Sequence, residues 1–525
     1  MKRRSFIQRT SAVTLPILMG GFPVHAFGRN YRLAAMTGLT QETDRVLILV
    51  QLNGGNDGLN TVLPLDQYSP LSAARANILI PESRALKLDD KTGLHPAMSG
   101  MHHLYEDQKL AIVQGAGYPD PNFSHFRSTD IWTTASEADV VLDTGWLGRY
   151  LDTLYPGFPE GYPNEAFPDP PAITIGSVVS ATCQGPVANL GLALTDPDNV
   201  NTLLTGGTAP VPATPYGHEL TFLRQTMLQT NQYITVIEAA SQLGQNLSTQ
   251  YPATGQNRLA DQLKIVARLI AGGLKTRVYV VNLGGFDTHT GQVDTSDHTT
   301  GTHANLLQTL SDAIAAFQDD LSLLGLEDRV VGFTYSEFGR RIGSNSGSGT
   351  DHGAAAPLFV FGAQVNGKIF GENPVIPAEV SSRDNLPMQV DFRSVYASLL
   401  MDWFCVEEEV IRSVLFADFQ HIALIKTSTP VPDPPFTGTV AVLGTPAPNP
   451  FAATTTIPFQ TPAGHVLIQL FNAAGQRINT LTDQAYEAGS YEIPLDGEGL
   501  SPGVYYCRLQ QGGHQMVLPL VKTGK

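Results

Sequence analysis

The sequence has little basic charge and little cysteine, and each shortage excludes a class of function. Its 525 residues include 32 lysines and arginines against 48 acidic residues, a formal net charge of −16. This balance argues against nucleic acid as a partner, because proteins that bind it present a basic face. Three cysteines, Cys183, Cys405 and Cys507, cannot build a disulfide framework, and none forms the Cys-x-x-Cys pair of a zinc or redox site.

Long hydrophobic runs are also missing, so we expect no stable membrane span in the mature protein, since a span needs about 20 apolar residues. The N-terminus has instead the features of an export signal over residues 1–26. Arg3 and Arg4 precede a short apolar stretch, and Val24-His25-Ala26 suits a cleavage site. The arginine pair resembles the twin-arginine signal, which implies the twin-arginine translocase as a partner and transit through the periplasm. An ordinary secretory signal is the alternative.

Apolar runs that alternate with helical patterns predict an α/β domain over residues 44–425. The runs predict strands at 46–52, 110–114, 278–283 and 330–334, and helical spacing predicts helices over 258–274 and about 303–324. Strands that alternate with helices favour a mainly parallel sheet with helices on both faces. Each predicted strand ends in a glycine-rich or polar turn, and ligands of open α/β sheets bind at that edge.

The composition changes after residue 426. Residues 427–438 contain four prolines and predict a stiff linker. Short alternating runs separated by turns then predict a small β-sandwich over residues 439–525.

Two Asp/His pairs are the strongest candidates for metal ligands. Asp287 and His289 follow the predicted strand 278–283, and their spacing puts both on one side of an extended segment. Asp351 and His352 follow a Gly/Ser-rich loop. Two such pairs suit a two-metal hydrolase, and Asp57 in the first glycine-rich turn is a further candidate ligand. The alternative for each residue is a hydrogen bond that caps a turn.

Ser124, Arg127 and Arg340 are the candidate catalytic residues. Ser124 stands before a predicted helix and suits a nucleophile, although an N-cap role is the alternative. Arg127 and Arg340 suit the stabilisation of an oxyanion, although each is as compatible with a structural ion pair. No glycine-rich segment has the spacing of a dinucleotide or P-loop motif, so nucleotide binding is not predicted.

The C-terminal segment resembles a known secretion module. Its motifs include Pro448-Asn449-Pro450-Phe451, Phe471-Asn472-Ala473-Ala474-Gly475 and Leu500-Ser501-Pro502-Gly503-Val504-Tyr505. In this order they look like the type A C-terminal sorting domain of the type IX secretion system. The resemblance implies the type IX secretion machinery as a partner and a final location at the cell surface or outside the cell. An ordinary sandwich that binds sugar or protein is the alternative.

Residues 44–415 resemble the domain-of-unknown-function 1501 family. The resemblance rests on seven motifs in order: residues 49–61 (LVQLNGGNDGLNT), 124–126 (SHF), 145–150 (GWLGRY), 285–289 (GFDTH), 336–340 (SEFGR), 349–353 (GTDHG) and 391–393 (DFR). It implies a fold similar to the alkaline phosphatase and sulfatase superfamily, with Asp287, His289, Asp351 and His352 as metal ligands and Ser124 as nucleophile.

Two departures from the superfamily pattern put the metal centre in question. Asn53 stands where the superfamily has a metal-binding Asp, so Asp57 would have to substitute, and no clear final histidine follows Gly353. The dinuclear centre is then altered, mononuclear or lost. The sequence therefore leaves two hypotheses. The first is an exported hydrolase of anionic phosphate or sulfate esters that uses zinc, manganese, magnesium or calcium. The second is a non-catalytic secreted or cell-surface binding protein that keeps the fold.

Overall fold

The computed structural model describes residues 44–198, 215–426 and 441–523, the last without residues 445, 447, 448, 450, 473 and 474. It also describes the backbone of two strands, Pro16–Met19 (β1) and Phe22–His25 (β2), which pair antiparallel. The rest of the predicted export signal and the predicted linker at 427–438 lie outside the described residues. The chain divides into two compact units, one ending at Lys426 and the other containing the residues from Thr427 onward. None of the described helices is long and apolar enough to cross a membrane.

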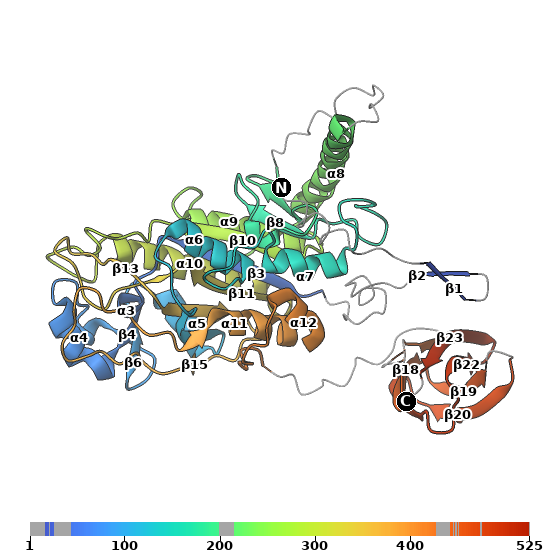
Figure 1. Ribbon diagram of the computed structural model, residues 1–525. Helices are drawn as coiled ribbons and strands as arrows, with labels where there is room; N and C mark the ends of the chain where they lie inside the picture. The colour runs from blue at the N-terminus through green and yellow to red at the C-terminus, as the bar shows by residue number, and fades with distance from the viewer. Residues whose placement is uncertain are drawn as a thin grey trace. The chain divides into compact units, whose positions relative to one another are not determined.

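A nine-stranded sheet forms the centre of the first unit (Figure 1). Three parallel neighbours lie in its middle: β11 (Val330–Ser336), β3 (Val46–Asn53) and β10 (Val278–Gly284). The order is β15-β7-β14-β11-β3-β10-β8-β9, with β16 also paired to β7. The outer strands are β7 (Leu110–Gly117), β8 (Ala172–Ile175), β9 (Gly191–Leu194), β14 (Ala356–Phe361), β15 (Ile369–Phe370) and β16 (Val390–Asp391).

The sheet is mainly parallel, as the sequence predicts. Only β14 runs antiparallel to its neighbours, β11 and β7. All four predicted strands lie within observed ones. The antiparallel β14 was not predicted, since its short apolar run follows a loop rather than a helix.

Helices cover both faces of the sheet because its central strands are apolar on both sides. In β3, Val46, Ile48 and Val50 pack into one core, whereas Leu47 and Leu49 pack into the other. The first core is completed by α5 (Ser99–Glu106), α9 (Arg258–Ala271) and α10 (Thr302–Leu323). The second is completed by α7 (Trp146–Leu154), α11 (Phe392–Ser398) and α12 (Glu408–Leu415).

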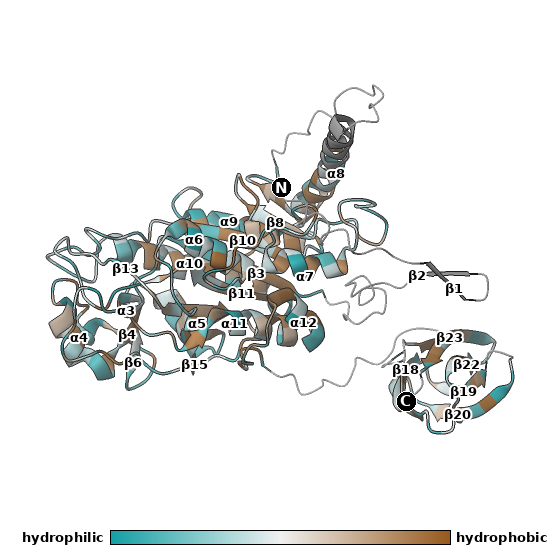
Figure 2. Ribbon diagram, in the orientation of Figure 1, coloured by the Kyte–Doolittle hydropathy of each residue, from teal (hydrophilic) through white to brown (hydrophobic). Residues whose placement is uncertain are grey.

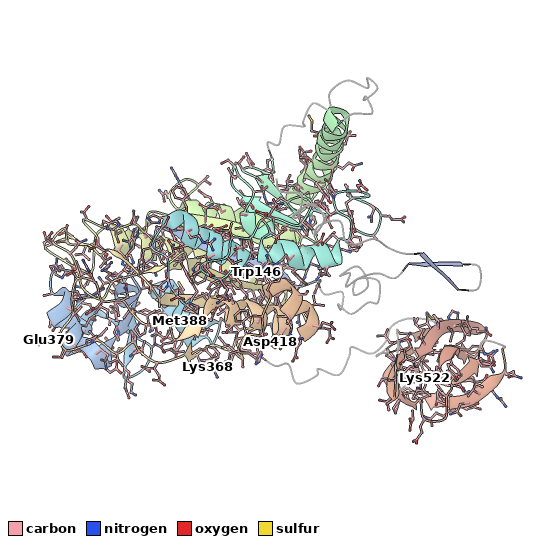
Figure 3. All side chains as sticks on the ribbon, viewed as in Figure 1. Trp146, Lys368, Glu379, Met388, Asp418 and Lys522 are labelled. Atoms are coloured by element: carbon pink, nitrogen blue, oxygen red, sulfur yellow. The ribbon has the colours of Figure 1, made fainter. Side chains whose placement is uncertain are left out.

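Helices α7 and α12 are amphipathic, as their teal and brown faces in Figure 2 show. Trp146 of α7, labelled in Figure 3, is fully buried and stacks on Tyr396 of α11 at 4.1 Å between ring centroids. The other elements of the unit are α3 (Gly58–Thr61), β4 (Val62–Pro64), α4 (Tyr68–Arg75), β5 (Leu86–Lys87), β6 (Thr92–Leu94), α6 (His125–Thr134), α8 (Pro215–Leu243), β12 (Gly339–Arg340) and β13 (His352–Gly353).

The second unit is a two-sheet antiparallel β structure. One sheet has the order β17-β18-β21 and the other β20-β19-β22-β23. Side chains from both, including Phe459 and Leu509, form one buried core, which is the arrangement of the predicted sandwich. The strands are β17 (Val442–Leu443), β18 (Thr454–Thr461), β19 (Gly464–Asn472), β20 (Arg477–Tyr486), β21 (Gly489–Asp496), β22 (Gly503–Gln511) and β23 (His514–Lys522).

Candidate metal centre

The polar turns that follow β3, β10 and β11 meet at one edge of the sheet, because these strands are parallel neighbours. Gly54, just after β3, has φ +124°, and a Cβ on it would lie 2.3 Å from the backbone nitrogen of Asp287. Only glycine permits this approach of the two turns. The short ladder between β12 and β13 brings His352 to the same edge, opposite Arg340.

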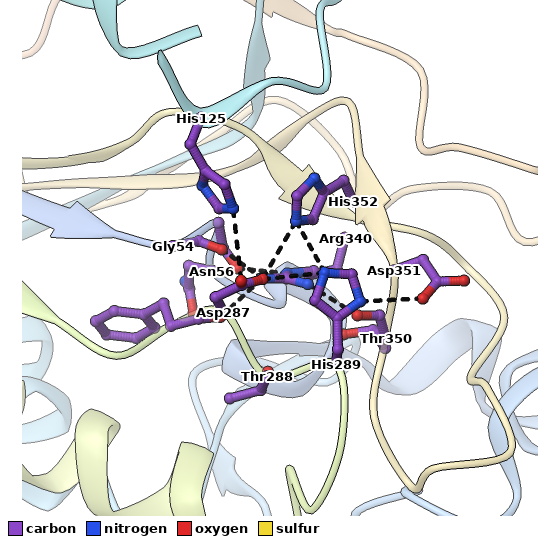
Figure 4. A network of polar contacts seen from close by, with 12 residues as sticks. Gly54, Asn56, His125, Asp287, Thr288, His289, Arg340, Thr350, Asp351 and His352 are labelled. Atoms are coloured by element: carbon purple, nitrogen blue, oxygen red, sulfur yellow. Dashed lines mark hydrogen bonds and ion pairs between the residues drawn. The ribbon is translucent and has the colours of Figure 1, made fainter.

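Three histidines surround the carboxylate of Asp287 (Figure 4). One oxygen, Oδ1, lies 3.1 Å from Nε2 of His289 and 3.2 Å from Nε2 of His352. The other, Oδ2, lies 3.5 Å from Nε2 of His125. The Nε2 atoms of His289 and His352 are 2.9 Å apart. Donor atoms of His125, Asp287 and His352 all lie within 4.8 Å of one another.

The other ring nitrogen of each histidine contacts an oxygen that can only accept a hydrogen bond. Nδ1 of His352 lies 2.8 Å from the carbonyl oxygen of Phe123, and Nδ1 of His125 lies 2.8 Å from a carboxylate oxygen of Glu337. Nδ1 of His289 lies 3.1 Å from Oδ1 of Asp351. A hydrogen bond to each acceptor requires a proton on Nδ1, so Nε2 is the atom of each ring that faces Asp287.

Asp287 is a carboxylate at neutral pH. Burial raises its pKa, but the Arg340 guanidinium, which donates a hydrogen bond to this carboxylate, outweighs burial and lowers the pKa to about 2. Burial lowers the pKa of His352, which favours the neutral ring. The cluster therefore directs imidazole nitrogens and a negative oxygen toward a common point.

This donor set fits a metal ion. A tetrahedral site with zinc–nitrogen bonds of about 2.0–2.1 Å places its donor atoms about 3.3 Å apart. The close donor pairs here are separated by 2.9 Å to 3.5 Å. Metal-binding histidines also donate their second N–H to a carboxylate or backbone carbonyl, as the rings of His125, His289 and His352 do here.

Glu337 and Arg340 contact residues of the cluster, and both side chains are buried. Besides His125, the Glu337 carboxylate accepts a hydrogen bond from the backbone N–H of Gly54 at 2.8 Å. The Arg340 guanidinium donates to Asp287 at 2.7 Å, to the carbonyl of Gly55 at 2.7 Å and also to the carbonyl of Gly54. The buried Arg340 guanidinium thus links the turns after β3 and β10. The sequence suggested that Arg340 stabilises an oxyanion, but its guanidinium is already hydrogen-bonded to groups of the protein.

The structure brings together four of the five predicted metal ligands. Asp287, His289 and His352 contact one another, and Asp351 contacts His289. The two Asp/His pairs therefore form one cluster around Asp287, rather than two separate pairs.

Asp57 does not join this cluster, contrary to the prediction. Its carboxylate lies 2.9 Å from the guanidinium of Arg75, and both side chains are almost fully buried. Burial raises the pKa of Asp57, but Arg75 outweighs it and lowers the pKa below its usual value. A carboxylate buried this deeply needs a paired charge, and the chain supplies an arginine rather than a metal.

Ser124 and Arg127 lie on either side of His125 in the chain, at the start of α6. Ser124 is the N-cap residue of α6, yet its side chain makes no capping hydrogen bond and is exposed. Arg127 pairs with Asp130 one turn along α6 and donates to the carbonyl oxygen of Val140 at 2.6 Å. Its predicted role as an oxyanion clamp is therefore not supported, whereas Ser124 stands next to a residue of the cluster.

Sequence reasoning missed His125 and Glu337 as members of the site. Both lie in motifs that the resemblance uses, Ser-His-Phe and Ser-Glu-Phe-Gly-Arg, and Glu337 directly follows β11. The available signal was an acidic residue directly after the apolar run that predicts a central strand.

Two family models match separate segments of the chain. Residues 224–415 match the model described as "Protein of unknown function (DUF1501)", and residues 447–523 match the "Secretion system C-terminal sorting domain". Both predicted resemblances are confirmed. The sorting domain points to export and to a cell-surface or secreted location, whereas the twin-arginine signal stays a prediction.

A comparison with curated proteins found no match. Solved structures that resemble the chain include the PsFucS1 sulfatase from Pseudoalteromonas sp., with 9% identity, 89% of this chain and 86% of that chain covered, and a TM-score of 0.32. A protein in the alkaline phosphatase superfamily from Vibrio parahaemolyticus has 10% identity, 91% and 84% coverage, and a TM-score of 0.32. The phosphonate monoester hydrolase SpPMH from Silicibacter pomeroyi has 9% identity, 91% and 89% coverage, and a TM-score of 0.28.

Proposed function

We propose that the chain is an exported metal-dependent hydrolase of phosphate or sulfate esters. The observation that carries the proposal is the orientation of the rings in the cluster: His125, His289 and His352 each engage an oxygen through Nδ1 and turn Nε2 toward the Asp287 carboxylate. The Nε2 atoms of His289 and His352 lie 2.9 Å apart, close to the separation of two ligands of one metal ion.

The residues favour one transition-metal ion. Imidazole nitrogens with one carboxylate suit zinc better than magnesium or calcium, which prefer oxygen ligands. His125, Asp287 and His352 form the core of the set, and His289 is the adjacent fourth donor. A divalent ion held there would act as a Lewis acid toward an ester oxygen. A single ion is favoured because both Asp/His pairs converge on Asp287, while Arg340 donates to the same carboxylate.

Ser124 is the candidate nucleophile in this proposal. It is exposed and lies next to His125 in the chain, so its hydroxyl is accessible from solvent. The ten-residue helix α6 begins directly after it, and the backbone N–H groups at a helix N-terminus favour an anion such as a phosphate or sulfate group.

A second function, the binding of a partner without catalysis, is favoured by one observation. Both predicted oxyanion clamps, Arg127 and Arg340, direct their guanidinium groups at carboxylates and carbonyls of the protein itself. A hydrolase would then rely on the metal ion and on helix α6 to stabilise the charge of the substrate.

Hydrolysis assays on the full chain distinguish these functions. We expect zinc-supplemented protein to hydrolyse p-nitrophenyl phosphate or p-nitrophenyl sulfate. The Ser124→Ala variant should lose that activity yet keep its metal, because the serine contacts the substrate rather than the ion. No hydrolysis of either ester with metal bound would favour the binding protein, and full activity in Ser124→Ala would remove this serine as nucleophile.

A matched control lies on α5. His102, His103 and Glu106 also place three candidate donor atoms within 4.8 Å of one another, but on an exposed helix surface. The double variant His102→Ala/His103→Ala should keep the metal content and the activity of the wild type.

A further inference from the structure

Gln292 connects the segments of the metal cluster without belonging to it. It follows His289 by three residues and its side chain is fully buried. Its Oε1 accepts hydrogen bonds from the hydroxyls of Thr288 at 3.0 Å and Thr350 at 2.8 Å. Its Nε2 donates to the carboxylate of Asp57 at 2.6 Å. A carboxylate only accepts hydrogen bonds, so this orientation of the amide is the one that satisfies all three contacts.

Both threonines stand next to candidate ligands. Thr288 lies between Asp287 and His289, and Thr350 precedes Asp351 and His352. The backbone N–H of Thr350 also donates to the carbonyl oxygen of Thr288 at 3.2 Å. One amide oxygen therefore joins the two segments that carry the Asp/His pairs, although these segments are about sixty residues apart in the chain.

Asp57, which accepts the hydrogen bond from Gln292, is itself held by an ion pair. Asp57 is paired with Arg75, which also donates to the backbone carbonyl oxygens of Ile342 at 2.9 Å and Arg341 at 2.7 Å. These two residues follow β12, the partner strand of His352. The contacts thus run from the turn after β3, through Gln292, to both ligand-bearing segments.

We infer that Gln292 is a positioning residue that holds the Asp287–His289 and Asp351–His352 segments at metal-binding distance. The inference rests on the proposed function, since it requires the cluster to bind a metal ion. It also assigns a role to the buried Asp57–Arg75 pair, which anchors Gln292 rather than binding the ion.

The variant Gln292→Met tests this inference because methionine has a similar shape but cannot form the three hydrogen bonds. Zinc affinity of the full chain is measured by competition with a chromophoric chelator, and the visible spectrum of the cobalt-substituted protein reports the ligand geometry. Loss of an outer-shell contact typically weakens metal affinity by about 10–100-fold, so we expect a loss in this range and an altered cobalt spectrum. Wild-type affinity together with a wild-type spectrum would overturn the inference.

Gln318→Met is the matched control. Gln318 is also buried, in α10, but neither of its amide atoms has a hydrogen-bond partner in the described part of the chain. The Gln318→Met variant should bind zinc like the wild type. A loss of affinity equal to that of Gln292→Met would overturn the specific role of Gln292.

Thr350→Val keeps the inference testable if Gln292→Met does not fold. It removes one of the three hydrogen bonds, so zinc affinity should fall by a smaller factor, and wild-type affinity would count against the inference. A wild-type chain that binds neither zinc nor cobalt would overturn the metal centre itself. If the wild type binds zinc and Gln292→Met binds it equally well, only the role of Gln292 is overturned.

Discussion

Removing the guanidinium of Arg75 should destabilise the α/β unit severely. Arg75 and Asp57 form a buried ion pair, with 0% and 1% of their side chains exposed. The substitution Arg75→Met leaves the Asp57 carboxylate without its cation. It also removes the hydrogen bonds to the side-chain oxygen of Asn60 and to the carbonyl oxygens of Arg341 and Ile342.

The magnitude follows from this burial. Breaking a buried pair by removing one partner costs about 3–5 kcal/mol, because a charge is left uncompensated. The double variant Arg75→Met/Asp57→Asn removes that stranded charge and should regain about 2 kcal/mol relative to the sum of the single substitutions.

Tryptophan fluorescence during urea unfolding measures this effect selectively. The three tryptophans, Trp132, Trp146 and Trp403, all lie in the first unit, so the signal excludes the C-terminal sandwich. Arg412→Met is the control, since Arg412 forms an exposed ion pair with Asp418 and should unfold like the wild type. A loss below about 1 kcal/mol in Arg75→Met, the range of a surface pair, would refute the buried-pair reasoning.

Two further predictions concern pH and packing. Burial lowers the pKa of His303 to about 4, so the unfolded state binds the extra proton first and the free energy of unfolding falls as pH decreases from about 6.5 to 4. His303→Gln should reduce that fall by about 3 kcal/mol in urea unfolding at several pH values, and an unchanged pH profile would contradict this assignment. A Cβ at Gly349 would lie 2.4 Å from the backbone of His289, so Gly349→Ala should weaken zinc binding in the chelator competition assay. Gly284→Ala, where no atom lies within 4 Å of the added Cβ, should bind zinc normally, and equal behaviour of the two variants would count against the packing argument.

The sequence was sufficient to predict the central strands of the sheet and their parallel direction. Strands β3, β10 and β11 are continuous apolar runs, and such runs identify buried parallel strands because both of their faces are covered. Their parallel direction follows from the alternation of strands with helices. The placement of Asp287 at this edge was predictable for the same reason, since the carboxyl ends of parallel strands share one edge. His352 reaches the edge through the ladder of β12 and β13 instead.

The identity of the partners inside the site could not be predicted. Nothing in the sequence near Asp57 indicates that Arg75, eighteen residues away, neutralises it, because the pairing depends on how α4 packs. The burial of Arg340 depends in the same way on three turns that close around it. His125 adjoins the predicted nucleophile Ser124, and only the tertiary contact with Glu337 reveals which way its ring faces.

Metal content is the most direct test of the proposed centre. The full chain, purified without chelator or affinity metal and then supplied with zinc, is analysed by inductively coupled plasma mass spectrometry beside the double variant Asp287→Ala/His352→Ala. The structure predicts one ion per chain in the wild type and near-complete loss in the variant, with the far-ultraviolet circular dichroism unchanged. Absence of metal from the wild type would contradict the centre, two tightly bound ions would contradict its single-ion form, and equal metal in both proteins would place the ion elsewhere.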